Sequence, residues 1–292
     1  MSLFSGLEHV VRENEPLAPY TTLRLGGVAE YFAEPTSIDE LSEIIQRAKE
    51  NEMPIRLIGG GSNILVRDEG VPGMVLQLSA PAFGQLVIEG ELVTVGGGVS
   101  LPHFVSATVR EDLAGAHHLV GIPGTVGGAL HANSGTGGHD IGRWLIRAAV
   151  VTRSGQFAIR ESDALSFSYR SSSLNELAII EATFRFPRDT AGDLTRRLQK
   201  LWIVKRSQQP LIGDPCAYVF KNHGGEPAGE LIERAGLKGT QMGKVELFDR
   251  NPNFFVAHPG AKSADVLRLI DLVKSQVQER LSIDLSLSLD LW

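Results

Sequence analysis

The amino-acid sequence predicts an α+β fold with a glycine-rich first domain and a smaller second domain. Strand and helix patterns alternate between about residues 20 and 75, glycine-rich segments recur up to residue 138, and the pattern changes past residue 210. The length of 292 residues allows about two domains at roughly 150 residues each. We therefore expect one domain over residues 1–190 and a second over residues 191–292.

The first domain opens with a helix and strands that run into glycines. Ser37 and Glu40 have the spacing of a helical capping box, and residues 54–58 form a short apolar strand that leads directly into Gly59. The apolar stripe of the helix consists of Leu41, Ile44, Ile45 and Ala48. Later elements are a strand over 92–95, a hairpin over 148–160 turning at 154–155, a strand over 177–186 and a helix over 192–206.

The second domain contains a strand, a long helix and an alternating end. Residues 253–257 have a strand pattern, and a helix begins near Ser263. The apolar residues of this helix at helical spacing are Val266, Ile270, Val273 and Val277. Residues 281–291 alternate between leucine or isoleucine and serine or aspartate, which predicts a strand with one polar face.

Composition excludes several classes of protein. Hydrophobic residues make up 42% and charged residues 21% of the chain, which is typical of a globular protein rather than a disordered one. The net charge of −6 gives no reason to expect nucleic acid or a membrane as a partner. Cys216 is the single cysteine, which excludes an internal disulfide. The first residues lack the pattern of a secretory signal, so we expect a cytoplasmic protein.

Glycine loops at strand ends indicate a phosphate-bearing ligand. In residues 59–63, backbone N–H groups can approach a phosphate without obstruction, and Ser62 and Asn63 add polar side chains. A dinucleotide-binding GxGxxG motif would need glycine where Ile64 stands, and the Gly-Lys pair at 243–244 lacks the following serine or threonine of a P-loop. Each cluster alone could be a tight turn. Several clusters together favour a large phosphate-bearing ligand.

The histidines form no metal-binding pattern. His117 and His118 are adjacent, and His131 and His139 flank glycines, so we interpret all four as pocket-lining or surface residues and expect no metal. A nucleophile elbow of the kind that serine hydrolases use is absent from the sequence.

A set of motifs in register resembles the UDP-N-acetylenolpyruvoylglucosamine reductase family, in the short form that lacks an extra loop in the substrate domain. The motifs are TLRLGG at 22–27, GGGSNILV at 59–66, GIPGTVGG at 121–128, NSG at 133–135, SYR at 168–170 and VFKN at 219–222. The resemblance continues through AGELI at 228–232 and AGLKG at 235–239. It extends from about residue 16 to the end of the chain.

The resemblance implies a flavoenzyme. The first part would be an FAD-binding domain of the vanillyl-alcohol-oxidase (PCMH) type in two α+β subdomains, and the second an α+β substrate-binding domain. NADPH would reduce a non-covalent FAD, and hydride would then pass to the vinyl carbon of UDP-N-acetylenolpyruvoylglucosamine to give UDP-N-acetylmuramate for peptidoglycan. The protein would be a monomer that binds a UDP-sugar. The implied cofactor-binding residues are Gly59, Gly60, Gly61, Ser62, Asn63, Ile64, Ile122, Pro123, Gly124, Thr125, Gly128, Asn133, Ser134 and Gly135.

The resemblance also assigns residues to the substrate. Arg170 matches the family's catalytic arginine, and a guanidinium suits the carboxylate on which negative charge develops. Lys221 and Asn222 match the substrate-binding pair, and Tyr169 lies beside Arg170 in the same motif.

Two catalytic positions depart from the family pattern. Tyr218 stands where the family has a serine that donates a proton, and Ser288 stands where it has a glutamate. A phenol, with a reference pKa of about 10, is a more acidic donor than an aliphatic hydroxyl, although its bulk takes up space. Cys216 is a second candidate donor, Tyr218 could merely fill the pocket, and Asp290 lies about 7 Å beyond Ser288 on the same face. A catalytically degenerate relative, or another flavin oxidoreductase on this scaffold, is the alternative.

Overall fold

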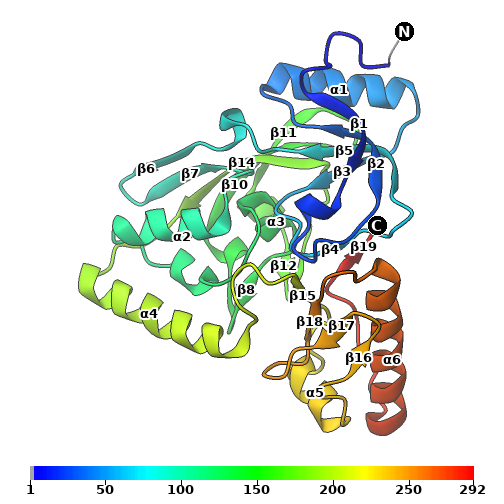
Figure 1. Ribbon diagram of the computed structural model, residues 1–292. Helices are drawn as coiled ribbons and strands as arrows, with labels where there is room; N and C mark the ends of the chain where they lie inside the picture. The colour runs from blue at the N-terminus through cyan, green and yellow to red at the C-terminus, as the bar shows by residue number, and fades with distance from the viewer. Residues whose placement is uncertain (1–2) are drawn as a thin grey trace. The chain divides into compact units, whose positions relative to one another are not determined.

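The computed structural model describes residues 3–292, which group into two compact units (Figure 1). The first unit contains residues up to 15, 30–60 and 72–203, and the second contains 16–29, 61–71 and 204–292. This division differs from a single boundary near residue 190, because two early segments of the chain belong to the second unit.

A four-stranded sheet and one helix form one part of the first unit. Its strand order is β1-β2-β5-β3, and β3 pairs with β5 in parallel. Helix α1 begins after Ser37, whose hydroxyl accepts a hydrogen bond from the backbone N–H of Glu40 at 3.2 Å. The predicted helix, capping residue and apolar stripe are thereby confirmed. The bounds are β1 Val11–Pro16, β2 Val28–Ala33, α1 Ile38–Glu50, β3 Ile55–Ile58 and β5 Val71–Gln77.

A five-stranded antiparallel sheet forms the other part of the first unit. Its order is β11-β10-β14-β7-β6 (Figure 1). Helices α2 and α3 contribute buried residues to the core on this sheet. The predicted hairpin is confirmed, with Val151 paired to Phe157. The bounds are β6 Leu86–Glu89, β7 Leu92–Gly96, α2 Leu101–Arg110, α3 Val126–His131, β10 Leu145–Val151, β11 Phe157–Glu161 and β14 Ala178–Arg185.

Short elements complete the first unit, and a helix leads out of it. The two-residue strands are β8 Gly135–Thr136, β9 His139–Asp140, β12 Phe167–Ser168 and β13 Ser171–Ser172. The 3-10 turns are Pro81–Phe83, Ala116–Leu119, Ile141–Trp144 and Ser162–Ala164. Helix α4, Ala191–Gln208, begins in the first unit and confirms the predicted helix. Within residues 3–292, no helix has the length and apolar character that a membrane span requires.

The second unit is a four-stranded antiparallel sheet with two helices. Its strand order is β15-β18-β17-β16, and the predicted long helix is α6, with the expected apolar residues buried. The bounds are a 3-10 turn at Ala18–Tyr20, β4 Ile64–Leu65, β15 Cys216–Tyr218, α5 Ala228–Arg234, β16 Gln241–Met242, β17 Val245–Leu247, β18 Phe254–Ala257, α6 Ser263–Leu281 and β19 Asp290–Leu291.

The alternating end of the chain is less regular than the sequence predicts. Leu285 and Leu289 are buried as expected, but only β19 is a strand, paired in parallel with β4. Leu287 makes a single bridge to Phe220. The alternation therefore describes which side chains are buried, whereas the backbone pairs with two different segments and forms no continuous ladder.

Asn253 extends the pairing of β15 and β18 beyond the strands. Its fully buried side chain accepts a hydrogen bond from the N–H of Phe220 and donates one to the carbonyl of Phe220, both at 2.8 Å. Its own carbonyl accepts from the N–H of Val219 at 3.0 Å. This amide holds the backbone that follows Tyr218.

Replacing Asn253 by alanine should destabilise the protein substantially. The change leaves both buried backbone groups of Phe220 without a partner, at about 1–3 kcal/mol each, so we expect a loss of about 2–6 kcal/mol in the free energy of unfolding. Urea denaturation measures it. Ser275→Ala, on the exposed surface of α6, is the control and should change stability by less than about 0.5 kcal/mol. Equal midpoints for the Asn253 variant and the wild type would contradict this account.

Candidate functional site

Two of the predicted cofactor loops meet backbone to backbone in the first unit. Gly59 and Gly60 follow β3, and Gly124 and Thr125 precede α3. A Cβ on Gly60 would lie 2.7 Å from the Cα of Gly124, and one on Gly59 would lie 2.6 Å from the hydroxyl of Thr125. Real Cβ atoms do not approach other atoms so closely, and position 60 would meet backbone, which cannot rotate away. Packing therefore requires glycine at position 60, whereas a side chain at position 59 would have to displace the hydroxyl of Thr125.

A third glycine cluster supports the GIPGTVGG segment. The N–H of Gly127 donates to the carbonyl of Gly97 at 2.9 Å, and the N–H of Gly97 donates to the carbonyl of Ile180 in β14 at 2.7 Å. Thr125 caps α3 by accepting from the N–H of Gly128 at 3.3 Å. The segment is thus fixed to the five-stranded sheet through its backbone.

The rest of the predicted phosphate loop belongs to the second unit. Gly61 has a φ of +60°, and a Cβ there would lie 1.9 Å from the carbonyl oxygen of Tyr20. The amide of Asn63 donates to the carbonyl of Ser288 at 2.8 Å, and the carbonyl of Asn63 accepts from the N–H of Asp290 at 2.9 Å. Ile64 pairs with Asp290. Residues 61–64 therefore hold the end of the chain, in addition to any role at a cofactor.

The NSG segment is the most buried of the predicted cofactor residues. Asn133 is 2% exposed and Ser134 is 8% exposed. A Cβ on Gly135 would lie 2.1 Å from Oδ1 of Asp140. The side chain of Asn133 is hydrogen-bonded within the protein: its amide donates to the carbonyl of Ser168 and to Asp140, and its oxygen accepts from the N–H of Gly142.

Arg170 lies at the tip of a small hairpin in the first unit. β12 and β13 pair through Ser168 and Ser171, so Tyr169 and Arg170 form the turn between them. The φ of Arg170 is +53°, in the left-handed region that arginine rarely adopts. Its Nε is buried and has no hydrogen-bond partner among the described residues. A buried N–H of a cation without a partner is suited to an anionic ligand, which would satisfy it.

Tyr218 forms a polar pair with Asn222 in the second unit. Its hydroxyl donates to Oδ1 of Asn222 at 3.0 Å, and the same oxygen accepts from the N–H of Ala228 at 3.2 Å. The ring of Tyr218 meets the ring of Phe254 edge to face, with 5.3 Å between centroids. These contacts fix the phenol and orient the amide of Asn222.

Ser288 lies next to the strand end that carries Tyr218. The carbonyl of Val219 accepts from the N–H groups of Ser288 at 2.8 Å and of Leu289 at 3.3 Å. The N–H of Lys221 donates to the carbonyl of Ser286 at 2.8 Å. The structure thus brings together, within one unit, the segments that carry Tyr218 and Ser288.

Cys216, the other candidate donor, is a poor acid in this position. Burial, with a smaller effect from Asp214, raises the pKa of its thiol to about 11. It lies in β15 two residues before Tyr218 and is partly buried.

The histidines form a stack of rings that residue spacing could not predict. The rings of His118 and His139 are parallel, with 3.7 Å between centroids, and His117 packs against His118 at 4.0 Å. Burial, followed by the charge of Arg197 and the neighbouring His139, lowers the pKa of His117 to about 4. Its Nδ1 accepts from the N–H of Gly115 at 3.1 Å. His117 therefore stays neutral near pH 7.

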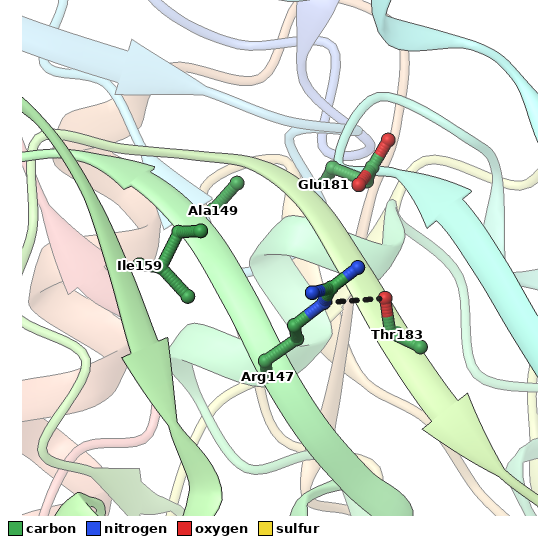
Figure 2. A pocket seen from close by; sticks show the side chains of 5 residues that line it. All are labelled: Arg147, Ala149, Ile159, Glu181 and Thr183. Carbon is green, nitrogen blue, oxygen red and sulfur yellow. Dashed lines mark hydrogen bonds between the residues drawn. The ribbon is translucent and has the colours of Figure 1, made fainter.

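A small cavity on the five-stranded sheet is separate from all the predicted site residues. It has a volume of about 90 Å³ and is lined by side chains of β10, β11 and β14 (Figure 2). Nε of Arg147 donates to the hydroxyl of Thr183 at 3.4 Å across it. A cavity of this size can hold a few water molecules but not a dinucleotide.

Comparisons with known proteins agree with this geometry. A family model of an FAD binding domain matches residues 29–158, and a model of the C-terminal domain of UDP-N-acetylenolpyruvoylglucosamine reductase matches residues 209–292. The α+β fold class with an FAD-binding domain is thereby confirmed.

Relatives match over nearly the whole chain. A UDP-N-acetylenolpyruvoylglucosamine reductase of Rhodopirellula baltica is 38% identical over 286 residues, which cover 98% of this chain and 94% of the relative. The enzyme of that name from Bacillus subtilis is 36% identical over 279 residues, which cover 94% of this chain and 91% of the relative. The crystal structure of the reductase (MurB) from Thermus caldophilus superposes with a TM-score of 0.81 at 33% identity. The match covers 97% of this chain and 98% of that one. The chain therefore belongs to the UDP-N-acetylenolpyruvoylglucosamine reductase family.

Proposed function

We propose that this protein reduces UDP-N-acetylenolpyruvoylglucosamine to UDP-N-acetylmuramate, with FAD as a non-covalent cofactor and NADPH as the electron donor. The match to curated relatives of that name, over 98% of the chain in the first case, carries the proposal. The reaction belongs to peptidoglycan precursor synthesis. We propose that the protein is a monomer and that it acts in the cytoplasm.

The residues present fit a flavin dinucleotide. Where residues 59–60 meet Gly124, the backbone is free of side chains, and a pyrophosphate bound there would accept hydrogen bonds from N–H groups. Gly59, Gly60, Gly124 and Thr125 would hold it from the first unit. The flavin, when bound and reduced, supplies the hydride; the remaining chemistry belongs to side chains of the protein.

Arg170 is the group that we assign to the substrate carboxylate. Addition of hydride to the terminal vinyl carbon leaves negative charge at the neighbouring carbon and on its carboxylate. A guanidinium stabilises this charge more strongly in the transition state than in the ground state, which is the requirement for catalysis. The buried Nε without a partner and the positive φ of Arg170 support this role. Lys221 would neutralise charge on the sugar nucleotide.

Tyr218 is the group that we assign to protonation. The carbon that bears the carboxylate must gain a proton to complete the reduction, and a phenol can act as a general acid. Asn222 accepts the hydroxyl hydrogen at 3.0 Å and holds the phenol in place, and the O–H would turn from Asn222 to the substrate carbon to transfer its proton. The thiol of Cys216 is a weaker candidate, because burial raises its pKa to about 11 and makes it a poorer acid than an exposed thiol. Ser288 would contribute through its backbone, which connects Val219 and Asn63.

Two half-reactions test the proposed function. Under anaerobic conditions, NADPH should bleach the flavin absorbance of the FAD-loaded protein, and UDP-N-acetylenolpyruvoylglucosamine should then restore it with one equivalent of UDP-N-acetylmuramate. Flavin that binds and is reduced, but is not reoxidised by this substrate, would show that the protein is not this reductase. Reoxidation by a different acceptor would favour another flavin oxidoreductase on the same scaffold.

Tyr218→Phe tests the proton donor. Loss of a general acid costs about 10²-fold or more, so flavin reoxidation should slow by that factor while reduction by NADPH is unchanged. Tyr218→Ser, which restores a hydroxyl, should retain more activity than the phenylalanine variant. Tyr31→Phe removes the same hydroxyl group from a tyrosine whose ring packs on Phe4, so it is the control and should not change the rate of flavin reoxidation. If Cys216→Ser abolishes reoxidation and Tyr218→Phe does not, the thiol is the donor.

A further inference from the structure

We propose that Asn133 is a positioning residue that holds the hairpin of Arg170 in place and thereby couples the glycine-rich segment to the catalytic arginine. The inference rests on the proposed function of Arg170. It gives Asn133 a role that differs from the direct cofactor contact implied by the family resemblance.

The side chain of Asn133 is an internal clamp. Its Nδ2 donates to the carbonyl of Ser168 at 2.8 Å and to Oδ2 of Asp140 at 3.3 Å, and its Oδ1 accepts from the N–H of Gly142 at 3.1 Å. Both N–H groups of the amide therefore have protein acceptors, and the residue is 2% exposed. Ser168 lies two residues before Arg170 and ends the first strand of the hairpin.

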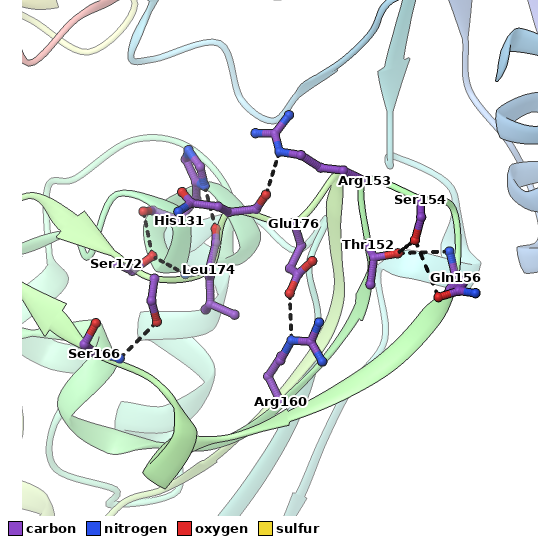
Figure 3. Close-up of polar contacts among 12 residues, drawn as sticks. His131, Thr152, Arg153, Ser154, Gln156, Arg160, Ser166, Ser172, Leu174 and Glu176 are labelled. Carbon is purple, nitrogen blue, oxygen red and sulfur yellow. Dashed lines mark hydrogen bonds and ion pairs between the residues drawn. The ribbon is translucent and has the colours of Figure 1, made fainter.

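The second strand of the hairpin is attached to the same helix end. The hydroxyl of Ser172 donates to the carbonyl of His131 at 2.8 Å, and Nδ1 of His131 lies 2.9 Å from the carbonyl of Leu174 (Figure 3). Because a carbonyl can only accept, this Nδ1 carries the hydrogen. His131 and Asn133 thus hold opposite sides of the hairpin, one through β13 and the other through β12.

Further contacts fix the segment that follows the hairpin. Nε of Arg160 donates to Glu176 at 2.7 Å, and Nε of Arg153 donates to the carbonyl of Asn175 at 2.9 Å (Figure 3). Both arginines come from the hairpin of β10 and β11 and its turn. The exit of the Arg170 hairpin is therefore anchored independently of Asn133, whereas the contacts of the Asn133 amide are on its entry side.

The hairpin needs such a clamp. Its strands contain two residues each, and an isolated hairpin of this kind is at best marginally stable. The left-handed backbone of Arg170 also disfavours the observed turn, so surrounding contacts must maintain it. Asn133 itself has a φ of +43°, a conformation that asparagine tolerates better than most residues. Loss of the amide should let Arg170 move while the fold remains.

Two substitutions of Asn133 distinguish the contribution of its side-chain amide from that of its backbone conformation. Asn133→Gly removes the amide and accepts the positive φ, and Asn133→Asp keeps the shape but replaces the donor to Ser168 with an oxygen. A shift of about 1 Å at a catalytic group can cost about 10²-fold, so we expect flavin reoxidation to slow about 10- to 100-fold in both variants. The dissociation constant of FAD and the rate of flavin reduction by NADPH should change less than about twofold. Asn175→Ala, an exposed asparagine on the same segment, is the control.

A double variant tests whether the effect passes through Arg170. If it does, flavin reoxidation in the double variant Asn133→Gly with Arg170→Lys should be about as slow as in Arg170→Lys alone. A lysine lacks the planar guanidinium whose orientation the amide of Asn133 maintains, so loss of that amide should have little further effect. Multiplicative losses would overturn the proposal. So would a fall in FAD affinity that accounts for the lost activity, because that result would make Asn133 a cofactor contact.

Hydrogen exchange tests the clamp without any assay of activity. Amides of residues 167–172 should exchange faster in Asn133→Gly than in the wild type, while those of β14 remain protected. Unchanged exchange in the hairpin would overturn the proposal even if the reductase reaction were confirmed. Faster exchange in a protein that fails to reduce the sugar nucleotide would instead uphold the clamp and reject the function of Arg170.

Discussion

The close approach of two backbones at Gly60 and Gly124 is the constraint on which the rest of the first unit depends. A gap of 2.7 Å from a Cβ position to a Cα leaves no room for any side chain. The segment that begins at Gly124 is held from the other side as well, through Gly127 and Gly97 to β14. This loop is therefore tied to the sheet by backbone hydrogen bonds and close packing, which favours a preorganised binding site.

The same segment leads from the proposed cofactor site to the proposed catalytic cation. Beyond the glycines it forms α3, ends at His131 and turns at Asn133. The carbonyl of His131 and the side chain of Asn133 hold the hairpin of Arg170. Cofactor and cation would then be positioned by one continuous, rigid piece of chain. In the second unit, backbone hydrogen bonds around Val219 connect the segments that carry Tyr218 and Ser288, and the amide of Asn222 holds the phenol of Tyr218.

Much of the fold could be predicted from the sequence because local signals agree with it. The capping residue Ser37, the apolar stripe of α1 and the turn between β10 and β11 depend on neighbours in the chain. The assignment of 16–29 and 61–71 to the second unit depends on distant pairing, such as β4 with β19, and has no local signal. For the same reason the sequence does not reveal the hydrogen-bond partners of the buried amides of Asn253 and Asn133, because Phe220 and Ser168 lie far from them along the chain.

Affinity for FAD in a Gly60→Ala variant tests the central claim most directly. Because the φ of Gly60 suits alanine, only the added Cβ changes, and it must displace the backbone at Gly124. We expect the dissociation constant of FAD, measured by fluorescence quenching, to rise at least about tenfold, which corresponds to about 1.4 kcal/mol. The control Gly84→Ala, whose Cβ would meet its nearest atom at 3.6 Å, should bind FAD like the wild type. Wild-type affinity in Gly60→Ala would contradict the claim that this contact builds the cofactor site.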